Sequence, residues 1–338
     1  MSSPSAEPPP GLSVVVPVRD GETTLAACLD ALLGSQGLPA FEIVVVDDGS
    51  RDRSTEIAAE RPCRRLRLCP GRGPAAARNA GAAAAGGAVL AFVDADVIVR
   101  HDTLSGLLAA LQGAPAAFAT YAERPAHDGF PTLFYHALSL RSLADTEEHT
   151  PAFYTYCAAL GASLFRELGG FDERFRGATF EDLDLGLRLA RRGLFSRHCR
   201  HLEVTHAVRY DARRLARAYF RKSRDLAFLL LSGRRLSASG QGWTDRRNWL
   251  SLFGSWGTLG LLVPAIARPW PWAAAWATAL LALLVRGLPP ALSLARRRAV
   301  YGPLALASFL AVNLVATAGM AVAALDRLGQ LANRRPPA

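Results

Sequence analysis

The stretch Ala88-Val-Leu-Ala-Phe-Val-Asp94-Ala-Asp96-Val-Ile-Val99 joins a run of apolar residues to two acids. The apolar, partly β-branched residues predict a buried strand of a parallel sheet. Asp94 and Asp96 stand two residues apart, so both side chains are expected on the same side of the strand end. There they could face one divalent cation, Mg²⁺ or Mn²⁺, or the hydroxyls of a sugar or ribose. Because an Asp-x-Asp pair is common by chance in a chain of 338 residues, its context decides.

Two similar segments precede this stretch. Residues 12–18 form an apolar run that contains Pro17, and residues 41–47 form another; the residues between them have helical apolar spacing. Strand, helix and strand with short connections predict a parallel β-α-β unit and an α/β fold. Ligands collect at the carboxyl ends of such strands, and there the sequence places Asp20, Asp47 and Asp48. Asp47-Asp48-Gly-Ser50 could equally be a turn in which Ser50 caps the next helix.

Arg78 and a group of acids form two further candidates. Arg78 stands near the start of an Ala-rich helix expected over residues 75–85, where it could bind a phosphate or be an ordinary polar residue. A second helix is expected to open with Glu181, Asp182 and Asp184. Acids in a first turn complement the helix dipole, and Thr179 with Asp182 would form a capping pair. Three acids exceed what a cap requires, and a helix start can present a general base.

His206 follows a run of alternating apolar and polar residues, 201–205. A single histidine is more often structural than functional, and here a role as metal ligand or phosphate contact stays open beside the structural one. Residues 212–231 interleave basic and apolar residues and predict a basic amphipathic helix, which suits anionic lipid headgroups or a phosphorylated acceptor.

The C-terminal region predicts a membrane anchor. Eight arginines and one acid lie from Trp249 onward, so most of the formal net charge of +10 belongs to an apolar region, which indicates charges flanking membrane spans and no nucleic-acid footprint. About three spans are expected, at residues 249–267, 270–294 and 303–325. The five cysteines contain no C-x-x-C pair, so neither a disulfide framework nor a zinc site is expected. Residues 1–11 predict a disordered leader.

The region from Leu12 to about Leu226 resembles the family 2 glycosyltransferases, which have the GT-A fold. The resemblance rests on six motifs in order: Val-Val-Val-Pro17, Asp47-Asp48-Gly-Ser50, Arg78-Asn79-x-Gly81, Asp94-x-Asp96, Gly-Gly-Phe171-Asp-Glu173 and Glu181-Asp182-x-Asp184. It implies a catalytic domain at 12–226. The charges and apolar stretches that follow predict a basic juxtamembrane linker at 227–248, a transmembrane region at 249–326 and a basic tail at 327–338. The catalytic domain would be a Rossmann-like, mainly parallel sheet flanked by helices.

The resemblance also implies roles for the candidate residues. The donor, a nucleotide sugar and usually a UDP-sugar, would contact Pro17, Asp20, Asp47, Asp48, Arg78 and Asp94. Asp96, with His206, would hold the Mg²⁺ or Mn²⁺ that neutralises the diphosphate leaving group. Asp182, assisted by Glu181, would deprotonate the acceptor for an inverting attack.

The expected protein is therefore a metal-dependent, inverting glycosyltransferase in the cytoplasmic membrane, with its catalytic domain in the cytoplasm. Its acceptor would be a hydroxyl or phosphate of a lipid, a lipid-linked molecule or a glycan, and no nucleic-acid partner is expected. The family's usual Thr-aromatic-Asn-Glu after the first proline is replaced by Val18-Arg-Asp-Gly21, and the Gln-x-x-Arg-Trp element of polysaccharide synthases is absent, which favours a single addition. A nucleotidyltransferase and a catalytically degenerate membrane scaffold are the alternatives.

Overall fold

The computed structural model describes residues 11–231, apart from 176, 178 and 179, and residues 280–332, apart from 282, 283 and 286. The chain divides into two compact units. Unit 1 contains the described residues up to Ala126 together with Glu147–Val208, and unit 2 contains His127–Thr146 together with the described residues from Arg209 onward. Residues 127–146 and 209–226, which lie within the predicted catalytic domain, thus belong to unit 2.

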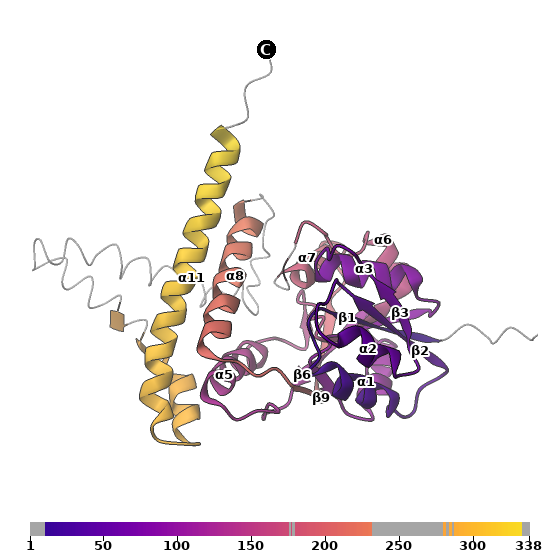
Figure 1. Cartoon of the computed structure of the whole chain (residues 1–338), viewed down its shortest axis with the longest axis horizontal. Coiled ribbons are helices and arrows are strands. Elements are labelled where there is room, and N and C mark those ends of the chain that lie inside the picture. The colour runs from indigo at the N-terminus through magenta and orange to yellow at the C-terminus, as the bar shows by residue number, and fades with distance from the viewer. Residues whose placement is uncertain are drawn as a thin grey trace, which may run out of the picture. The chain divides into compact units, whose positions relative to one another are not determined.

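One half of the unit 1 sheet is parallel. Its strands lie in the order β3–β2–β1–β4 and are β1 (Leu12–Val18), β2 (Phe41–Asp47), β3 (Arg64–Arg67) and β4 (Val89–Val93). They are connected by α1 (Leu25–Leu33), α2 (Ser54–Ala59) and α3 (Pro74–Ala84). The chain moves outward from β1 to β3 and then returns to β4 on the other side of β1. Right-handed crossovers therefore place α1 and α2 on one face and α3 on the other, as Figure 1 shows.

The other half of the sheet contains both parallel and antiparallel pairs. The prediction of a mainly parallel sheet therefore describes the first half. It continues from β4 in the order β8–β6–β9–β5, and β7 also pairs with β9. Its strands are β5 (Val97–Val99), β6 (Ala116–Tyr121), β7 (His149–Thr150), β8 (Cys157–Gly161) and β9 (Ser196–His206). Its helices are α4 (Thr103–Ala110), α6 (Ala162–Glu167) and α7 (Glu181–Ala190).

The stretch 88–99 forms two strands where one was expected. Asp94, Ala95 and Asp96 form a turn between β4 and β5, and β5 leaves β4 to pair antiparallel with the end of β9. The two acids therefore stand on a turn, where their directions are set by local hydrogen bonds as well as by strand alternation. The core under this turn is built from the buried inner residues of β1, β2 and β4.

Unit 2 is helical. It contains α5 (Phe130–Ala144), α8 (Ala212–Leu231), helical residues between 280 and 295, and α11 (Tyr301–Ala332). Its core joins Leu133 and Phe134 of α5 to Leu215 and Tyr219 of α8 and to apolar residues of the C-terminal helices. α8 and α11 lie side by side (Figure 1), and Gly319 of α11 is close to the Phe220 carbonyl. The expected basic amphipathic helix is α8; its exposed arginine stripe consists of Arg213, Arg214, Arg217, Arg221 and Arg224.

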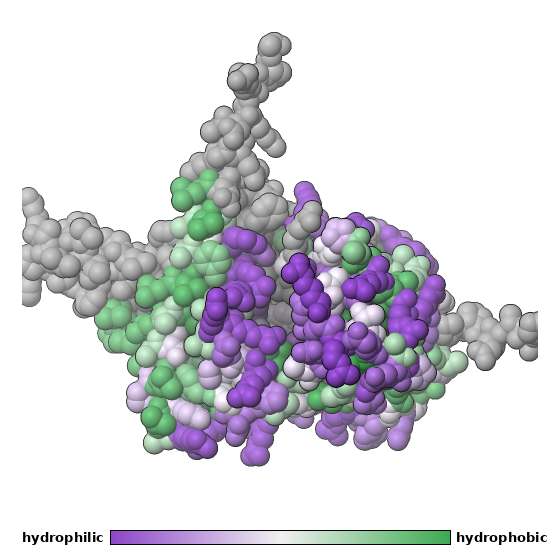
Figure 2. All heavy atoms as spheres, viewed as in Figure 1, coloured by the Kyte–Doolittle hydropathy of each residue, from purple (hydrophilic) through white to green (hydrophobic). Residues whose placement is uncertain are grey.

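One predicted membrane span coincides with a described helix. Within the described residues, Tyr301–Ala323 of α11 is the one helical segment long and apolar enough to cross a membrane, and it overlaps the predicted span at 303–325. The predicted span at 249–267 lies outside the described residues, as do the leader, most of the 227–248 linker and the end of the basic tail. Only the second part of the predicted span at 270–294 is described, and it is largely helical. Figure 2 shows apolar residues over the C-terminal helices of unit 2.

Candidate active site

The turn after β4 carries the two acids of the opening stretch. Its backbone is fixed by three hydrogen bonds: Asp94 N–H donates to the Tyr156 carbonyl (3.1 Å), Val97 N–H to the Asp94 carbonyl (3.0 Å), and Ala207 N–H to the Asp96 carbonyl (2.8 Å). The last bond ties Asp96 to the strand end that carries His206. Asp96 and His206 consequently approach each other, with 3.8 Å between the Asp96 Oδ2 and His206 Nε2 atoms.

Arg78 connects this turn to helix α7. Its side chain is only 2% exposed, and its guanidinium donates to Asp94 Oδ1 (2.6 Å) and Glu181 Oε1 (2.7 Å). The interior of the protein makes a buried charge costly unless it is paired, so the three groups depend on one another. Arg78 was expected to contact the donor, and Glu181 to assist the base. In the structure Arg78 and Glu181 hold each other in place, and Arg78 also holds Asp94.

The protonation of the acids reflects this burial. Loss of contact with water and the negative charge of neighbouring Glu181 together raise the pKa of Asp182 to about 7, against the opposing effect of Arg78. The same loss raises the pKa of Asp94 to about 6, although Arg78 counteracts it. A carboxylate with a pKa near 7 is a stronger base than an ordinary aspartate and is still ionised in a useful fraction at neutral pH.

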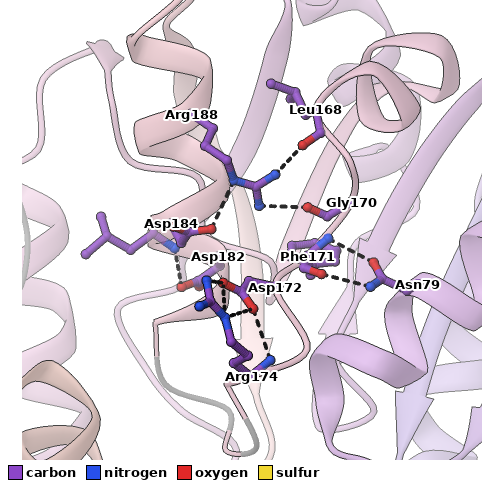
Figure 3. Close-up of polar contacts among 10 residues, drawn as sticks. Asn79, Leu168, Gly170, Phe171, Asp172, Arg174, Asp182, Asp184 and Arg188 are labelled. Atoms are coloured by element: carbon purple, nitrogen blue, oxygen red, sulfur yellow. Dashed lines mark hydrogen bonds and ion pairs between the residues drawn. The ribbon is translucent and has the colours of Figure 1, made fainter. Parts of the chain in front are cut away.

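Helix α7 begins at the candidate base and is held by its neighbouring loop. Asp182 Oδ1 accepts the Leu183 N–H at 2.7 Å. One turn further on, Arg188 binds Asp184 Oδ2 (3.0 Å) and donates to the carbonyls of Leu168 and Gly170 (Figure 3). The predicted capping role of Thr179 falls outside the described residues, and the residue before the helix, Phe180, makes no side-chain cap.

The loop that approaches α7 is also fixed from the opposite side. The Asn79 amide of α3 accepts the Phe171 N–H (2.8 Å) and donates to the Phe171 carbonyl (2.9 Å), as Figure 3 shows. Asn79 also donates to Glu173, and Arg72 forms an ion pair with the same carboxylate. These contacts join the helix of Arg78 to the loop before the candidate base.

The acids after β1 and β2 hold loops together. Asp48 accepts the N–H groups of Arg72 (2.6 Å) and Gly73 (2.9 Å), and thereby shapes the loop before α3. Asp47 accepts from the Ser50 N–H and the Thr55 hydroxyl, both at 2.7 Å. Burial alone would raise the pKa of Asp47, but these hydrogen bonds hold it below the ordinary value. Asp47 and Asp48 thus stabilise loops, as the structural alternative expected, but Ser50 does not cap the next helix, because the N-cap of α2 is Arg53.

Asp20 and Pro17 complete the set of candidates. Pro17 lies within β1 opposite Val46, one residue before the strand ends. Asp20 has a left-handed backbone (φ 52°), and its carboxylate accepts the Arg51 N–H at 2.8 Å. The parallel register places Asp20, Asp47, Asp48 and Asp94 at the same edge of the sheet, as expected.

The donor set at Asp96 and His206 fits a divalent cation. A carboxylate oxygen suits Mg²⁺ or Mn²⁺, and an imidazole nitrogen adds a ligand that the softer Mn²⁺ accepts readily. Within the described chain no group of three or more Asp, Glu, His and Cys side chains is assembled for a metal. Two protein ligands leave several positions of an ion open to phosphate oxygens, as is usual for Mg²⁺ sites.

Sequence reasoning missed two contributors to this edge. Arg188 could have been found from its i, i+4 spacing to Asp184, which is the spacing of a helical ion pair. Tyr121, whose ring lies beside His206, carries no local signal, because strand pairing between distant segments brings the two residues together.

Part of the chain is similar in sequence to known glycosyltransferases. The model of the family "Glycosyl transferase family 2" matches residues 13–169. Validoxylamine A glucosyltransferase from Streptomyces hygroscopicus is 32% identical over 247 residues, covering 60% of this chain and 57% of that protein. Pre-mycofactocin glycosyltransferase from Mycobacterium tuberculosis is 32% identical over 213 residues, covering 60% of this chain and 44% of that protein. The chain thus spans about half the length of these curated relatives.

The fold has a solved counterpart. A mannosyltransferase from Pyrobaculum calidifontis, solved in complex with GDP-Man and Mn²⁺, superposes with a TM-score of 0.59 and 22% identity, covering 94% of this chain and 90% of that one. This likeness supports the α/β sheet architecture of unit 1 with its flanking helices. The region at residues 13–169 therefore belongs to glycosyl transferase family 2.

Proposed function

We propose that this protein transfers a sugar from a nucleotide-sugar donor, a UDP-sugar by preference, to an acceptor hydroxyl or phosphate, with inversion at the anomeric carbon. The observation that carries the proposal is the position and basicity of Asp182. It stands in the first turn of α7, next to Glu181, which Arg78 links to Asp94, and its pKa is raised to about 7. A hydroxyl attacks well only when a base takes its proton, and this carboxylate is suited to that role.

In this reaction Asp182 accepts the proton of the acceptor hydroxyl. At the same time the oxygen of that hydroxyl forms a bond to the anomeric carbon of the donor. The bond between that carbon and the diphosphate oxygen breaks, and the diphosphate leaves with the electron pair. A divalent cation bound by Asp96 and His206 would supply neutralisation of the leaving charge. Arg78 keeps Asp94 and Glu181 fixed, so that the donor side and the base side of the site hold a constant geometry.

The nucleotide end of the donor would lie at the loops after β1 and β2. Asp48 shapes the 71–73 loop, and its carboxylate can accept a further hydrogen bond from a nucleobase N–H. The Pyrobaculum protein was solved with GDP-Man and Mn²⁺, which supports a nucleotide sugar and a divalent cation as the ligand classes of this fold. A UDP-sugar rests on the family resemblance, and a GDP-sugar is the competing donor.

The acceptor would be a lipid, a lipid-linked molecule or a glycan, reached at the cytoplasmic face of the cytoplasmic membrane. Unit 2 supports this localisation with its apolar helix Tyr301–Ala323 and with the arginine stripe of α8. Arginines near a membrane surface are attracted to anionic headgroups. Tethering would concentrate enzyme and acceptor in the same plane.

The test is nucleotide release from a panel of UDP-, GDP- and dTDP-sugars by the full chain in detergent. Wild type is compared with Asp96→Asn, each with Mn²⁺ and with EDTA. Asp102→Asn is the matched control, because it removes an acid from an exposed position just beyond β5. We expect release from one donor class, dependent on Mn²⁺, lost in Asp96→Asn and kept in Asp102→Asn. Because slow release without an acceptor is expected, metal-dependent UDP binding is measured in the same samples.

The scaffold alternative predicts a different result. A catalytically degenerate protein would complement a deletion strain even when Asp96→Asn and Asp182→Asn are combined. Failure of the double variant to complement, at normal abundance in the membrane, would support the enzyme.

A further inference from the structure

A group of aromatic rings lies beside His206 in unit 1. The Tyr121 ring stacks on Tyr156, with 4.2 Å between centroids and 17° between planes, and its centroid lies 5.1 Å from that of the His206 imidazole at 34°. The Tyr156 hydroxyl donates to the Ala119 carbonyl at 2.6 Å, and the Tyr156 side chain is buried. The inner ring is therefore anchored, and Tyr121 lies against both the anchored Tyr156 and the imidazole.

The strand register brings Tyr121 to this position. β6 and β9 run parallel, but the pairing skips from Cys199 opposite Ala119 to Glu203 opposite Thr120. Tyr121 consequently pairs with Val204, two residues before His206, so the side chains of these three residues share a face of the sheet. Irregular pairing of this kind is a known way to re-aim side chains at the end of a strand.

The backbone of His206 is fixed independently of its ring. Val97 of β5 pairs with His206, and the His206 carbonyl accepts the Ala126 N–H at 3.1 Å. These contacts set where the side chain starts, but they leave the two side-chain torsions of the imidazole to its neighbours. The Tyr121 ring, tilted by 34° from the imidazole plane, is an aromatic neighbour that contacts it.

We propose that Tyr121 is a positioning residue, whose ring holds the His206 imidazole in the orientation that directs Nε2 toward Asp96. This inference rests on the proposed function, in which Asp96 and His206 bind a divalent cation. Groups that orient a metal-binding histidine typically change metal affinity by about ten- to a hundredfold when they are removed. A ring face can serve this purpose, because offset aromatic stacking has a preferred geometry.

The experiment measures Mn²⁺ affinity in the presence of UDP, by electron paramagnetic resonance of free Mn²⁺, on the full chain in detergent. The variants are Tyr121→Ala, Tyr121→Phe, His206→Ala and the Tyr121→Ala/His206→Ala double variant. Tyr154→Ala is the matched control, since it removes an equal ring that packs on Phe118 and Tyr156. Tyr121→Leu, which preserves apolar bulk without a flat ring, replaces Tyr121→Ala if the latter fails to fold.

We expect Tyr121→Ala to weaken Mn²⁺ binding about tenfold, while Tyr121→Phe and Tyr154→Ala stay within about twofold of wild type. In the His206→Ala background the Tyr121 substitution should have no further effect, because nothing remains to position. An equal loss in both backgrounds, or unchanged affinity in Tyr121→Ala, would overturn the inference. Wild type that binds UDP without any Mn²⁺ dependence would contradict the metal site itself, which separates failure of the proposed function from failure of the role of Tyr121.

Discussion

The two units of this chain place their charged and apolar side chains in opposite ways. In unit 1 the charges of the site lie inside: Arg78 and Glu181 are each 2% exposed, and Asp48 is 3% exposed. In unit 2 the arginine stripe of α8 is exposed to solvent. Among the described residues, the exposed large apolar side chains are also concentrated in unit 2, nine of them against Leu33 and Phe195 in unit 1.

This difference suits unit 1 to the reaction and unit 2 to binding a surface. A buried charge is tolerated only with partners in fixed geometry, which is what a reacting centre needs. Exposed apolar side chains in such number are typical of a surface that meets a membrane or another protein, and exposed arginines cost little until a partner arrives. Substitutions in unit 1 should therefore affect the reaction and the folding, whereas substitutions of the arginine stripe should affect binding to a surface.

The largest effect is expected for Asp182→Asn. Removing the base should lower kcat by about 10²- to 10⁴-fold with little change in donor affinity, as measured by nucleotide release and by UDP binding. For wild type, kcat/KM should rise as the pH increases through about 7, where Asp182 loses its proton. A pH profile that is flat between 5 and 8 would contradict the assignment of the base.

The same variant should gain stability at high pH. Because the pKa of Asp182 in the folded protein lies above that of the unfolded chain, the folded state binds more protons between about pH 4 and pH 7, so stability falls as the pH rises through this range. Asparagine removes this cost of a few kcal/mol, at about 1.4 kcal/mol for each pKa unit. The melting temperature of Asp182→Asn should exceed that of wild type at pH 8 and match it near pH 4; the reverse order would contradict the raised pKa.

Arg78→Gln should cause the next largest loss. It leaves Asp94 and the buried Glu181 without their common cation, and breaking a buried ion pair on one side costs about 3–5 kcal/mol. Arg61→Gln is the control, because Arg61 pairs with an exposed carboxylate, Asp30, and such pairs contribute about 1 kcal/mol or less. Thermal melting of the two variants in detergent should separate them clearly. Equal melting temperatures would show that the buried network of unit 1 contributes no more than a surface pair.

The sequence predicted the parallel half of unit 1 well, since its information is local. Apolar runs that end in Asp20, Asp47 and Asp94 correspond to strands whose carboxyl ends meet at one edge. The paired function of Arg78 could not be predicted, because Glu181 lies 103 residues away and no spacing rule connects them. The same holds for Tyr121, whose neighbours depend on an irregular register between β6 and β9.

The strand order in the mixed half of the sheet and the place of α5 also depend on contacts between distant segments. β8 pairs antiparallel with both β4 and β6, which requires the chain to return to the middle of the sheet after a long excursion. Helix α5 has an apolar face that fits a core in either unit, and its membership in unit 2 depends on packing with α8 and α11. Periodicity shows that a face is buried, but not against what.

Gly71→Ala should have a smaller effect that is confined to the donor side of unit 1. A Cβ at this position would overlap the Asp48 carbonyl, so the loop that Asp48 holds must shift. Such overpacking costs about 1–3 kcal/mol, and UDP affinity should fall accordingly. Gly113→Ala is the control, because a Cβ there meets no atom within 4 Å. Unchanged UDP binding in Gly71→Ala would place the nucleotide away from this loop.

Substitutions of the arginine stripe in unit 2 are expected to have the smallest effect per residue. Arg213, Arg217 and Arg221 of the arginine stripe, replaced together by glutamine, should each remove about 1 kcal/mol of attraction to an anionic surface. The measurement is hydrogen exchange of α8 amides, with the full chain in nanodiscs of neutral lipid or of neutral lipid mixed with anionic lipid. Wild type should be more protected in the anionic nanodiscs, and the triple variant should not.

Arg65→Gln with Arg191→Gln removes exposed charge from unit 1 and should leave this difference intact. High salt should abolish the difference, because exposed charges are screened; equal exchange in both lipids at low salt would mean that the stripe meets a different partner.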